Sequence, residues 1–350
     1  MTAPDIPNET PYAGLDPEVV LDALDAVGLR GDGRLIQLNS YENRVFQVFL
    51  EEGAPVVAKF YRPGRWTNEQ ILEEHQFASE LLAGEVPVAA PLVLTLDARS
   101  LRADRAALIG PTLASFQTTL GQHRFAVAQR MAGRGPELED LSVLEWIGRY
   151  IGRIHAVGAR GRFAHRQTMD VATFGTTARA GLLAHGTIPP DSVAAWSSVS
   201  QLALQMAQAA FDSLSDARQI RLHGDCHPGN ILWTAHGPHF VDLDDAVTGP
   251  AVQDLWMLLS GERADRTAQL AALLDGYEQF MDFDWRELRL IEALRTLRMI
   301  HHSAWIARRW NDPAFPVAFT WFESPAYWDE QTRRLREQLE AMAEPALGGQ

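Results

Sequence analysis

The first third of the chain carries short apolar runs separated by polar turns. Residues 35–38, 45–50 and 56–61 have the length and the branched and aromatic content of strands, and a polar segment at 39–44 separates the first two. Their succession predicts an antiparallel meander. Before it, residues 17–29 repeat apolar positions at helical spacing, so we expect a helix there.

A second helix with a defined start follows the third strand. Residues 67–70 have the pattern of a capping box, and the helix is expected to end near Gly84. Glu74 falls on its apolar stripe, whereas Glu73 falls among polar residues. Because a lone buried carboxylate is costly, Glu74 is expected to pair with Lys59 of the third strand. Glu73 is the alternative partner.

The pattern changes near residue 131. Strands are expected at 92–96 and 125–128, and the Gly and Pro residues of 131–136 then interrupt the alternation. Downstream the spacing becomes helical, with helices expected at 141–154, 193–214, 253–259, 267–280 and 285–310. The tryptophan-rich tail should pack against these helices. We therefore predict an α+β fold of two lobes, a small antiparallel-sheet lobe at 1–130 and a larger, mainly helical lobe at 131–350.

Composition narrows the function classes. The 350 residues are 46% hydrophobic and carry a formal charge of −14, which argues against nucleic acid as a partner. We find no apolar run of membrane-spanning length, and residues 1–7 lack the profile of a signal peptide. These features predict a cytoplasmic protein that binds no membrane. The single cysteine, Cys226, fits a reducing compartment, and its place beside Asp225 raises the question of oxidation.

The stretch 221–230, Arg-Leu-His-Gly-Asp-Cys-His-Pro-Gly-Asn, predicts a phosphotransferase centre. Asp225 and Asn230 are five positions apart, so one loop can carry a proton acceptor for an attacking hydroxyl and a ligand for Mg²⁺. Asp242 is expected to be the second metal ligand. The apolar runs at 231–233 and 239–241 predict a hairpin that would bring its two ends together.

A zinc site is the competing chemistry for this stretch. His223, Cys226 and His227 are all possible zinc ligands, but no partner pair elsewhere completes a usual zinc spacing. His223 is more simply explained as a brace of the loop through hydrogen bonds of its ring to the backbone.

The segment 39–44 lies where a kinase would hold the phosphates of ATP. It contains no glycine, although protein kinases usually cover ATP with a glycine-rich loop. Ser40, Asn43 and the backbone amides would then have to supply the donors. An ordinary hairpin tip is the alternative interpretation.

These residues together resemble the aminoglycoside and choline phosphotransferase branch of the protein-kinase-like fold. Lys59, Glu74, the 223–230 loop and Asp242 match its layout. The strings at 38–45, 59–63, 71–77, 86–91, 241–246 and 312–316 are similar to those of bacterial stress response kinases. The resemblance implies a cytosolic, monomeric serine/threonine protein kinase that uses ATP and Mg²⁺ and acts under stress.

The resemblance also implies individual roles. Ser40 would lie in the ATP site, Asp225 would accept the proton, and Asn230 and Asp242 would bind Mg²⁺. Asp254 resembles the buried aspartate of the family that supports the catalytic loop, and a helix-capping role is its alternative.

One departure from protein kinases keeps other functions open. Only eleven residues separate Asp242 from Asp254, and no Ala-Pro-Glu segment lies between them, so the usual activation loop is missing. A small-molecule phosphotransferase acting on an aminoglycoside, choline or homoserine-like alcohol is the alternative function. A nucleotide-binding scaffold without catalysis is a third, disfavoured by the intact acidic residues and Asn230.

Overall fold

The computed structural model describes residues 11–348. The N-terminal residues 1–7 considered above lie outside this range. The chain divides into two compact units, of which the first contains residues up to 134 and residues 232–244, and the second contains 135–231 and 245 onward. Each unit has its own hydrophobic core.

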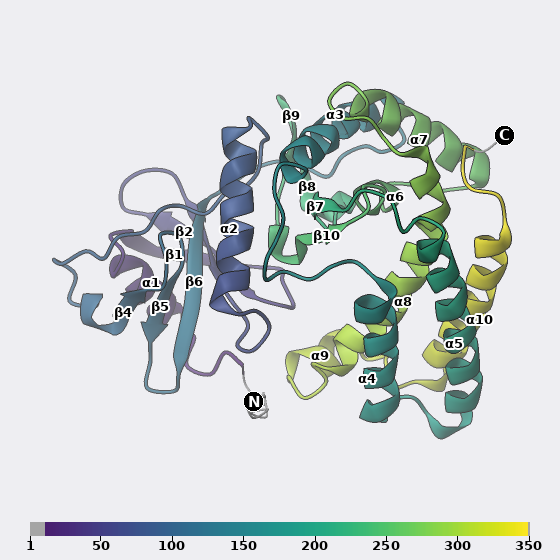
Figure 1. Cartoon of the computed structure of the whole chain (residues 1–350). Helices are drawn as coiled ribbons and strands as arrows, with labels where there is room; N and C mark the ends of the chain where they lie inside the picture. The colour runs from purple at the N-terminus through teal and green to yellow at the C-terminus, as the bar shows by residue number, and fades with distance from the viewer. Residues whose placement is uncertain (1–10, 349–350) are drawn as a thin grey trace. The chain divides into compact units, whose positions relative to one another are not determined.

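The first unit is built on a six-stranded antiparallel sheet with the order β1-β2-β3-β6-β5-β4 (Figure 1). Its strands are β1 (Gly31–Leu38), β2 (Arg44–Leu50), β3 (Val56–Phe60), β4 (Ala106–Leu108), β5 (Ala114–Gln117) and β6 (Gln122–Gln129). A short 3-10 helix, η1 (Ala103–Arg105), precedes β4. The predicted meander of three strands is confirmed, since β1 pairs with β2 and β2 with β3.

Two helices cover the sheet from opposite sides. The helix α1 (Pro17–Asp25) buries Val20 and Leu24 against residues such as Phe60 in the main core of the unit. The helix α2 (Asn68–Ala83) packs Ile71 beside Ala126 on the other face, and Figure 1 shows it running alongside the sheet. Both helices were predicted.

One predicted strand is wrong. Residues 92–96 run as an extended segment outside the sheet, because only the amides of Leu92 and Leu94 find carbonyl partners, at Val127 and Pro111. A strand needs a continued ladder with one neighbour. This edge of the sheet is formed instead by the short strand β4, which pairs with β5.

The second unit is mainly helical. Its helices are α3 (Leu141–Gly158), α4 (Ala178–His185), α5 (Pro190–Asp212), α6 (Gln253–Trp256), α7 (Arg263–Tyr277), α8 (Ile291–Ala307), α9 (Ala314–Ala318) and α10 (Pro325–Ala343). A π-helical turn, η2 (Ala172–Thr177), precedes α4, and a 3-10 turn, η5 (Trp285–Leu290), precedes α8. Figure 1 shows α5 and α10 side by side.

The predicted helices are confirmed, and α4, α9 and α10 are additional. Gly148 of α3 lets α7 approach closely, since a Cβ there would lie 2.0 Å from the carbonyl oxygen of Leu273. The tryptophan-rich tail packs as expected: Trp328 of α10 is fully buried and meets Trp196 of α5 edge to face. Among the described residues, no helix is both long and apolar enough to cross a membrane.

The sequence analysis placed the boundary at 130–131 and assigned all of 131–350 to the larger lobe. The structure groups one segment differently. The hairpin of β8 (Ile231–Thr234) and β9 (Gly237–Phe240) packs with the first unit, because Phe240 exchanges backbone hydrogen bonds with residues 87–89 and Trp233 does so with Arg134. The action of the two units as lobes stays a prediction.

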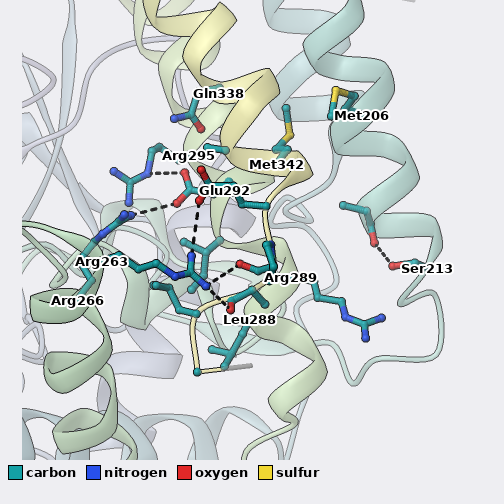
Figure 2. A pocket seen from close by; sticks show the side chains of 18 of the residues that line it. Met206, Ser213, Arg263, Arg266, Leu288, Arg289, Glu292, Arg295, Gln338 and Met342 are labelled. Atoms are coloured by element: carbon teal, nitrogen blue, oxygen red, sulfur yellow. Dashed lines mark hydrogen bonds and ion pairs between the residues drawn. The ribbon is translucent and has the colours of Figure 1, made fainter. Parts of the chain in front are cut away.

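The helical unit also has an open pocket of about 970 Å³ between α5, α7, η5, α8 and α10. Figure 2 shows Arg266 and Arg295 pointing toward Glu292 at its wall, with guanidinium-to-carboxylate distances of 3.3 and 3.1 Å. Arg263 donates to the carbonyl oxygens of Pro345 and Ala346. Arg266 therefore links α7 to α8, and Arg263 holds the segment after the last helix in place.

Candidate functional site

Lys59 lies at the centre of an acidic cluster in the first unit. It projects from β3, and its Nζ lies 3.0 Å from Asp242 Oδ1 and 3.9 Å from both Glu74 Oε1 and Asp244 Oδ1. Burial alone would lower the pKa of this amine, but the three carboxylates raise it well above its usual range. Lys59 is therefore a fixed cation.

Glu74 occupies the place that helical spacing predicts for it. It is buried on the face of α2 that also buries Ile71 and Phe77, and its carboxylate lies within ion-pair distance of Lys59. The N-terminus of α2 is fixed by the predicted capping box, since Thr67 accepts from the amide of Gln70 and donates its own amide to the side chain of Gln70. The helix start thus fixes the position of the carboxylate.

The glycine-free segment 39–44 is held by side chains. Arg62 donates to the carbonyl oxygens of Tyr41 and Glu42, at 3.1 and 3.0 Å. The buried amide of Asn43 donates to Asp244 and accepts from the backbone of Arg62, and Ser40 accepts from the amide of Asn43. Asn43 therefore braces the segment, and its contact with a nucleotide stays a prediction.

Asp244 is a residue of this cluster to which the sequence analysis gave no role. Its carboxylate is buried and lies 2.6 Å from Arg65 and 3.2 Å from the amide nitrogen of Asn43. It thereby ties the segment after Asp242 to the segment 39–44. The repeated acids of Val-Asp-Leu-Asp-Asp could have suggested that a second aspartate takes part.

Asp242 follows β9 in an unusual conformation. Its φ of 59° lies in the left-handed region, where residues other than glycine are uncommon and where aspartate is tolerated better than most. Half of its side chain is exposed, and among the described residues only Lys59 bonds to it, through Oδ1. The second carboxylate oxygen is free to bind a cation.

The second unit carries the loop 223–230. Its start is anchored by β7 (Ile220–Leu222), which pairs antiparallel with β10 (Val247–Gly249). Gly224 must be glycine, because its φ is +86° and a Cβ would lie 2.1 Å from the carbonyl oxygen of Asp245. This explains the glycine of the His-Gly-Asp string.

Asp254 supports the loop from behind and does not cap its helix. It is fully buried, and its oxygens accept the backbone amides of His223 and Gly224, each at 2.8 Å. The ring of His155 on α3 links this carboxylate to α7, because its Nε2 lies 3.0 Å from Asp254 Oδ2 and its Nδ1 lies 3.0 Å from the hydroxyl of Tyr277. The N-terminus of α6 has no side-chain cap. The bracing role proposed for the ring of His223, itself fully buried, stays a prediction.

Asp225 and Asn230 are half-buried residues of this loop. The side-chain nitrogen of Asn230 donates to the backbone carbonyl of Asp225 at 3.0 Å. This bond leaves the amide oxygen of Asn230 without a hydrogen bond from the residues that the structure describes. Such an oxygen is a ligand that Mg²⁺ accepts.

Two basic side chains contact Asp225, and the sequence did not indicate that the first of them, Arg298, would be its neighbour. Arg298 of α8 donates to Oδ1 at 2.5 Å, and the ring of His227 lies 3.5 Å from Oδ2. Burial raises the pKa of Asp225, but Arg298 and His227 outweigh it and lower this pKa below its usual range. The carboxylate is therefore ionised at neutral pH.

Cys226 is not a reactive thiol. It is fully buried, and burial together with the charges of Asp254 and Asp225 raises its pKa well above the usual range. The oxidation considered from the sequence is therefore disfavoured. In the described part of the chain, no three His, Cys, Asp or Glu side chains are arranged to hold a metal ion, which leaves the zinc alternative without support.

The structure thus brings the predicted residues together in two sets. Lys59, Glu74 and Asp242 lie together in the first unit, near the braced segment that carries Ser40 and Asn43. The second unit holds the other set, on one loop and its support: His223, Asp225, Asn230 and Asp254.

A buried carboxylate below this loop should make stability depend on pH. Glu287 accepts from the amide of Val252 at 2.9 Å, and burial raises its pKa from 4.5 to about 7. The folded state therefore holds a proton that the unfolded chain releases, so the free energy of unfolding falls as pH rises between these values. As pH rises from 5 to 8, we expect the free energy of unfolding of Glu287→Gln to rise by roughly 3 kcal/mol relative to that of wild type.

Denaturant titrations at four pH values across this window measure the effect. Glu340→Gln on α10 is the matched control, because Glu340 is exposed and has no side-chain hydrogen bond among the described residues. A wild-type stability that stays flat from pH 5 to pH 8 would contradict the assignment.

The chain is similar to known proteins of one enzyme family. The model of the phosphotransferase enzyme family matches residues 34–291. Stress response kinase A of Escherichia coli (strain K12) is 43% identical over 336 residues, 96% of each chain. The serine/threonine protein kinase RdoA of Salmonella typhimurium (strain LT2) is 42% identical over 340 residues, 97% of each chain.

Solved structures share the fold at low sequence identity. A microcompartment-associated aminopropanol kinase superposes with a TM-score of 0.68 at 16% identity, over 93% of this chain and 98% of its own. The amicoumacin kinase hAmiN, solved with AMP-PNP, Ca²⁺ and Ami, gives 0.66 at 18% identity, over 91% and 94%. The chain therefore has the kinase-like α+β fold and belongs to the phosphotransferase enzyme family and, within it, to the stress response kinase A group.

Proposed function

We propose that this protein transfers the γ-phosphoryl group of ATP to serine and threonine hydroxyls of proteins, with Mg²⁺. The observation that carries the proposal is that each unit holds one part of the chemistry that phosphate transfer needs. One offers a lysine fixed by three carboxylates, and the other offers a half-buried carboxylate that Arg298 contacts and keeps ionised. The near full-length likeness to proteins named as kinases supports it.

Lys59 would bind the phosphates of ATP. Glu74 and Asp244 orient its amine, and these carboxylates keep the amine in its charged form. Ser40 and the backbone amides of its segment would contact the nucleotide from the side, and Asn43 would keep that segment in place. Arg62 would also keep that segment in place, through its hydrogen bonds to carbonyl oxygens of the segment.

Asp242 and Asn230 would hold Mg²⁺. Each has one side-chain oxygen that accepts no bond from the described residues, and both are the hard oxygen ligands that this ion requires. When bound with the nucleotide, Mg²⁺ neutralises charge on the phosphate oxygens. Few protein ligands are expected, because phosphates and water usually complete its coordination.

Asp225 would accept the proton of the attacking hydroxyl. Its pKa, lowered by Arg298 and His227, keeps it in the ionised form that a proton acceptor needs. Asp254 would hold the loop so that this carboxylate keeps its orientation, through the amides of His223 and Gly224.

We further infer that the protein works as a monomer in the cytoplasm during bacterial stress responses. The names of its relatives support the stress response, and the acidic composition argues against nucleic acid as a partner. Protein substrates with serine or threonine acceptors are the expected partners besides ATP.

A small-molecule phosphotransferase is the second candidate. The observation that favours it is the short connection after Asp242, which is filled by η4 (Leu243–Asp245), β10 and α6 and so includes no segment that could seat a peptide. The amicoumacin and aminopropanol kinases of the same fold act, by their names, on small molecules. A non-catalytic scaffold is disfavoured because the acidic set is complete.

Labelled ATP distinguishes these functions. We expect purified protein with Mg²⁺ to place label on serine or threonine of acceptor proteins, and Asp242→Asn or removal of Mg²⁺ to abolish transfer. The control is Asp275→Asn on α7, an exposed aspartate whose side chain bonds to no described residue. Label on an alcohol of a metabolite extract would favour the second candidate, and nucleotide binding without transfer to any acceptor would favour the scaffold.

A further inference from the structure

The helix beside Asp225 is basic in a protein that is otherwise acidic. The whole chain has 45 acidic and 31 basic side chains. Between Glu292 and Asp312, however, there is no aspartate or glutamate, whereas the stretch carries four arginines and two histidines: Arg295, Arg298, His301, His302, Arg308 and Arg309. Most of this stretch is α8, which supplies the cation that contacts Asp225.

Arg298 is held by Asp225 alone. Its side chain is 43% exposed, and among the described residues the carboxylate of Asp225 is its only hydrogen-bond or ion-pair partner. An exposed ion pair of this kind contributes little to stability and can exchange partners. Arg298 is therefore available to a second anion.

The other groups around Asp225 are also cationic or neutral. His227 lies 3.5 Å from its carboxylate, and His302, one turn after Arg298 on α8, lies close enough to be influenced by the charges of Arg298 and Asp225. The nearest acid of α8 in the sequence, Glu292, is used by Arg266 and Arg295. Asp254 is buried behind the loop.

We propose that the acceptor of this kinase carries an anionic group beside its hydroxyl, and that Arg298 binds that group. The inference rests on the proposed phosphotransfer at Asp225. Arg298 would move from Asp225 to the anion of the acceptor, which frees the carboxylate for the hydroxyl proton. Arg298 is thus a specificity-determining residue, and the expected protein acceptors are serines or threonines flanked by aspartate or glutamate.

The step balances without another reactant. The hydroxyl oxygen of the acceptor forms a bond to the γ-phosphorus as the bond from that phosphorus to the bridging oxygen of ADP breaks. The hydroxyl proton passes to Asp225 and then to solvent. Arg298 changes only its ion-pair partner, so its charge is conserved through the transfer.

A cationic acceptor would meet the opposite situation. An ammonium group next to the hydroxyl would approach the guanidinium of Arg298, the cation that contacts Asp225. Like charges placed together raise the free energy of a complex, which is a common source of specificity. Amino alcohols and aminoglycosides are therefore expected to be poor acceptors.

Matched acceptors test the proposal. We expect a serine peptide flanked by glutamates to be phosphorylated with a kcat/KM roughly tenfold or more above the same peptide flanked by lysines, as a charge-assisted bond allows. Glycerate and choline repeat the comparison for small alcohols. In Arg298→Gln the ratio should fall toward one through a higher KM for the acidic peptide, and Arg298→Lys should restore part of it.

Two further measurements separate specificity from structure. Arg298→Gln and Arg298→Lys should unfold at temperatures close to that of wild type, because the ion pair of Arg298 with Asp225 is exposed and contributes little to stability. Arg289→Gln is the control, since Arg289 is exposed in η5 and makes no hydrogen bond or ion pair with the described residues. It should keep the preference of wild type.

The outcomes are distinguishable. A wild-type preference for basic acceptors, or equal rates for all charges, would overturn the inference and leave phosphotransfer intact. A preference for glycerate over choline without any labelled peptide would overturn the protein-kinase proposal and support the inference. Transfer to no acceptor would overturn both.

Discussion

Replacing Asp225 by asparagine is expected to lower the rate of phosphate transfer by about 10²–10⁴-fold, the usual contribution of a positioned proton acceptor. The amide cannot take up the hydroxyl proton at neutral pH. The fold should be retained, because the side chain of Asp225 bonds only to exposed partners, Arg298 and His227. Single-turnover transfer from labelled ATP measures the loss.

Binding of ATP should survive this substitution. Lys59 and its acidic neighbours belong to the other unit and keep their contacts. Because a proton acceptor acts on the transition state rather than on bound ATP, the affinity for a fluorescent ATP analogue should change by less than about threefold. The control variant Asp275→Asn should transfer phosphate as wild type does. A transfer rate of Asp225→Asn within threefold of wild type would remove Asp225 from the mechanism.

Substitution of Asp254 by alanine should cost about 3–5 kcal/mol of unfolding free energy, as expected when one partner of a buried charged network is removed. Two backbone amides and the ring of His155 would lose the same acceptor in a site with no access to water. Transfer activity should fall as well, because the loop that carries Asp225 loses its support. Thermal and denaturant unfolding measure the first effect.

An exposed aspartate provides the comparison. Asp140 caps α3 by accepting the amide of Ser142, and its replacement by alanine should cost only about 0.5–2 kcal/mol. The loss of unfolding free energy in Asp254→Asn should lie between those of Asp254→Ala and Asp140→Ala. The asparagine side chain keeps one oxygen acceptor, but its NH2 group would face an N–H donor. An equal loss of unfolding free energy in Asp254→Ala and Asp140→Ala would show that the buried network contributes no more to stability than a helix cap does.

The parts of the site that the sequence predicted are those set by local rules. The β1–β3 meander follows from alternation and turns, and the start of α2 follows from its capping box. Once that helix is placed, spacing alone puts Glu74 on the buried face that meets Lys59. These assignments needed no knowledge of distant contacts.

The parts that escaped prediction depend on tertiary packing. Arg298 and Asp225 are 73 residues apart, and nothing in an arginine on a helix indicates which carboxylate it will meet. His155 lies among apolar residues of α3, so the sequence suggests an ordinary core position. In the structure it links Asp254 to Tyr277. Such pairs are determined only when the helices pack.

Weak local signals explain the errors in the sheet. The run 92–96 is apolar enough for a strand, yet it finds only isolated backbone partners. The real edge strand β4 and its neighbour β5 are three and four residues long, and neither contains the β-branched residues that mark strands. The hairpin β8–β9 was predicted, but its membership of the first unit rests on Phe240 and Trp233.

The side-chain clamp on residues 41–43 has a consequence for inhibitors. Arg62 and Asn43 fix this segment through hydrogen bonds that a glycine-rich loop of an ordinary protein kinase would not have. A compound whose affinity depends on such a loop folding down over it would have to break several of these bonds first. Selective ligands should therefore be sought among rigid scaffolds that accept the clamped shape as it stands.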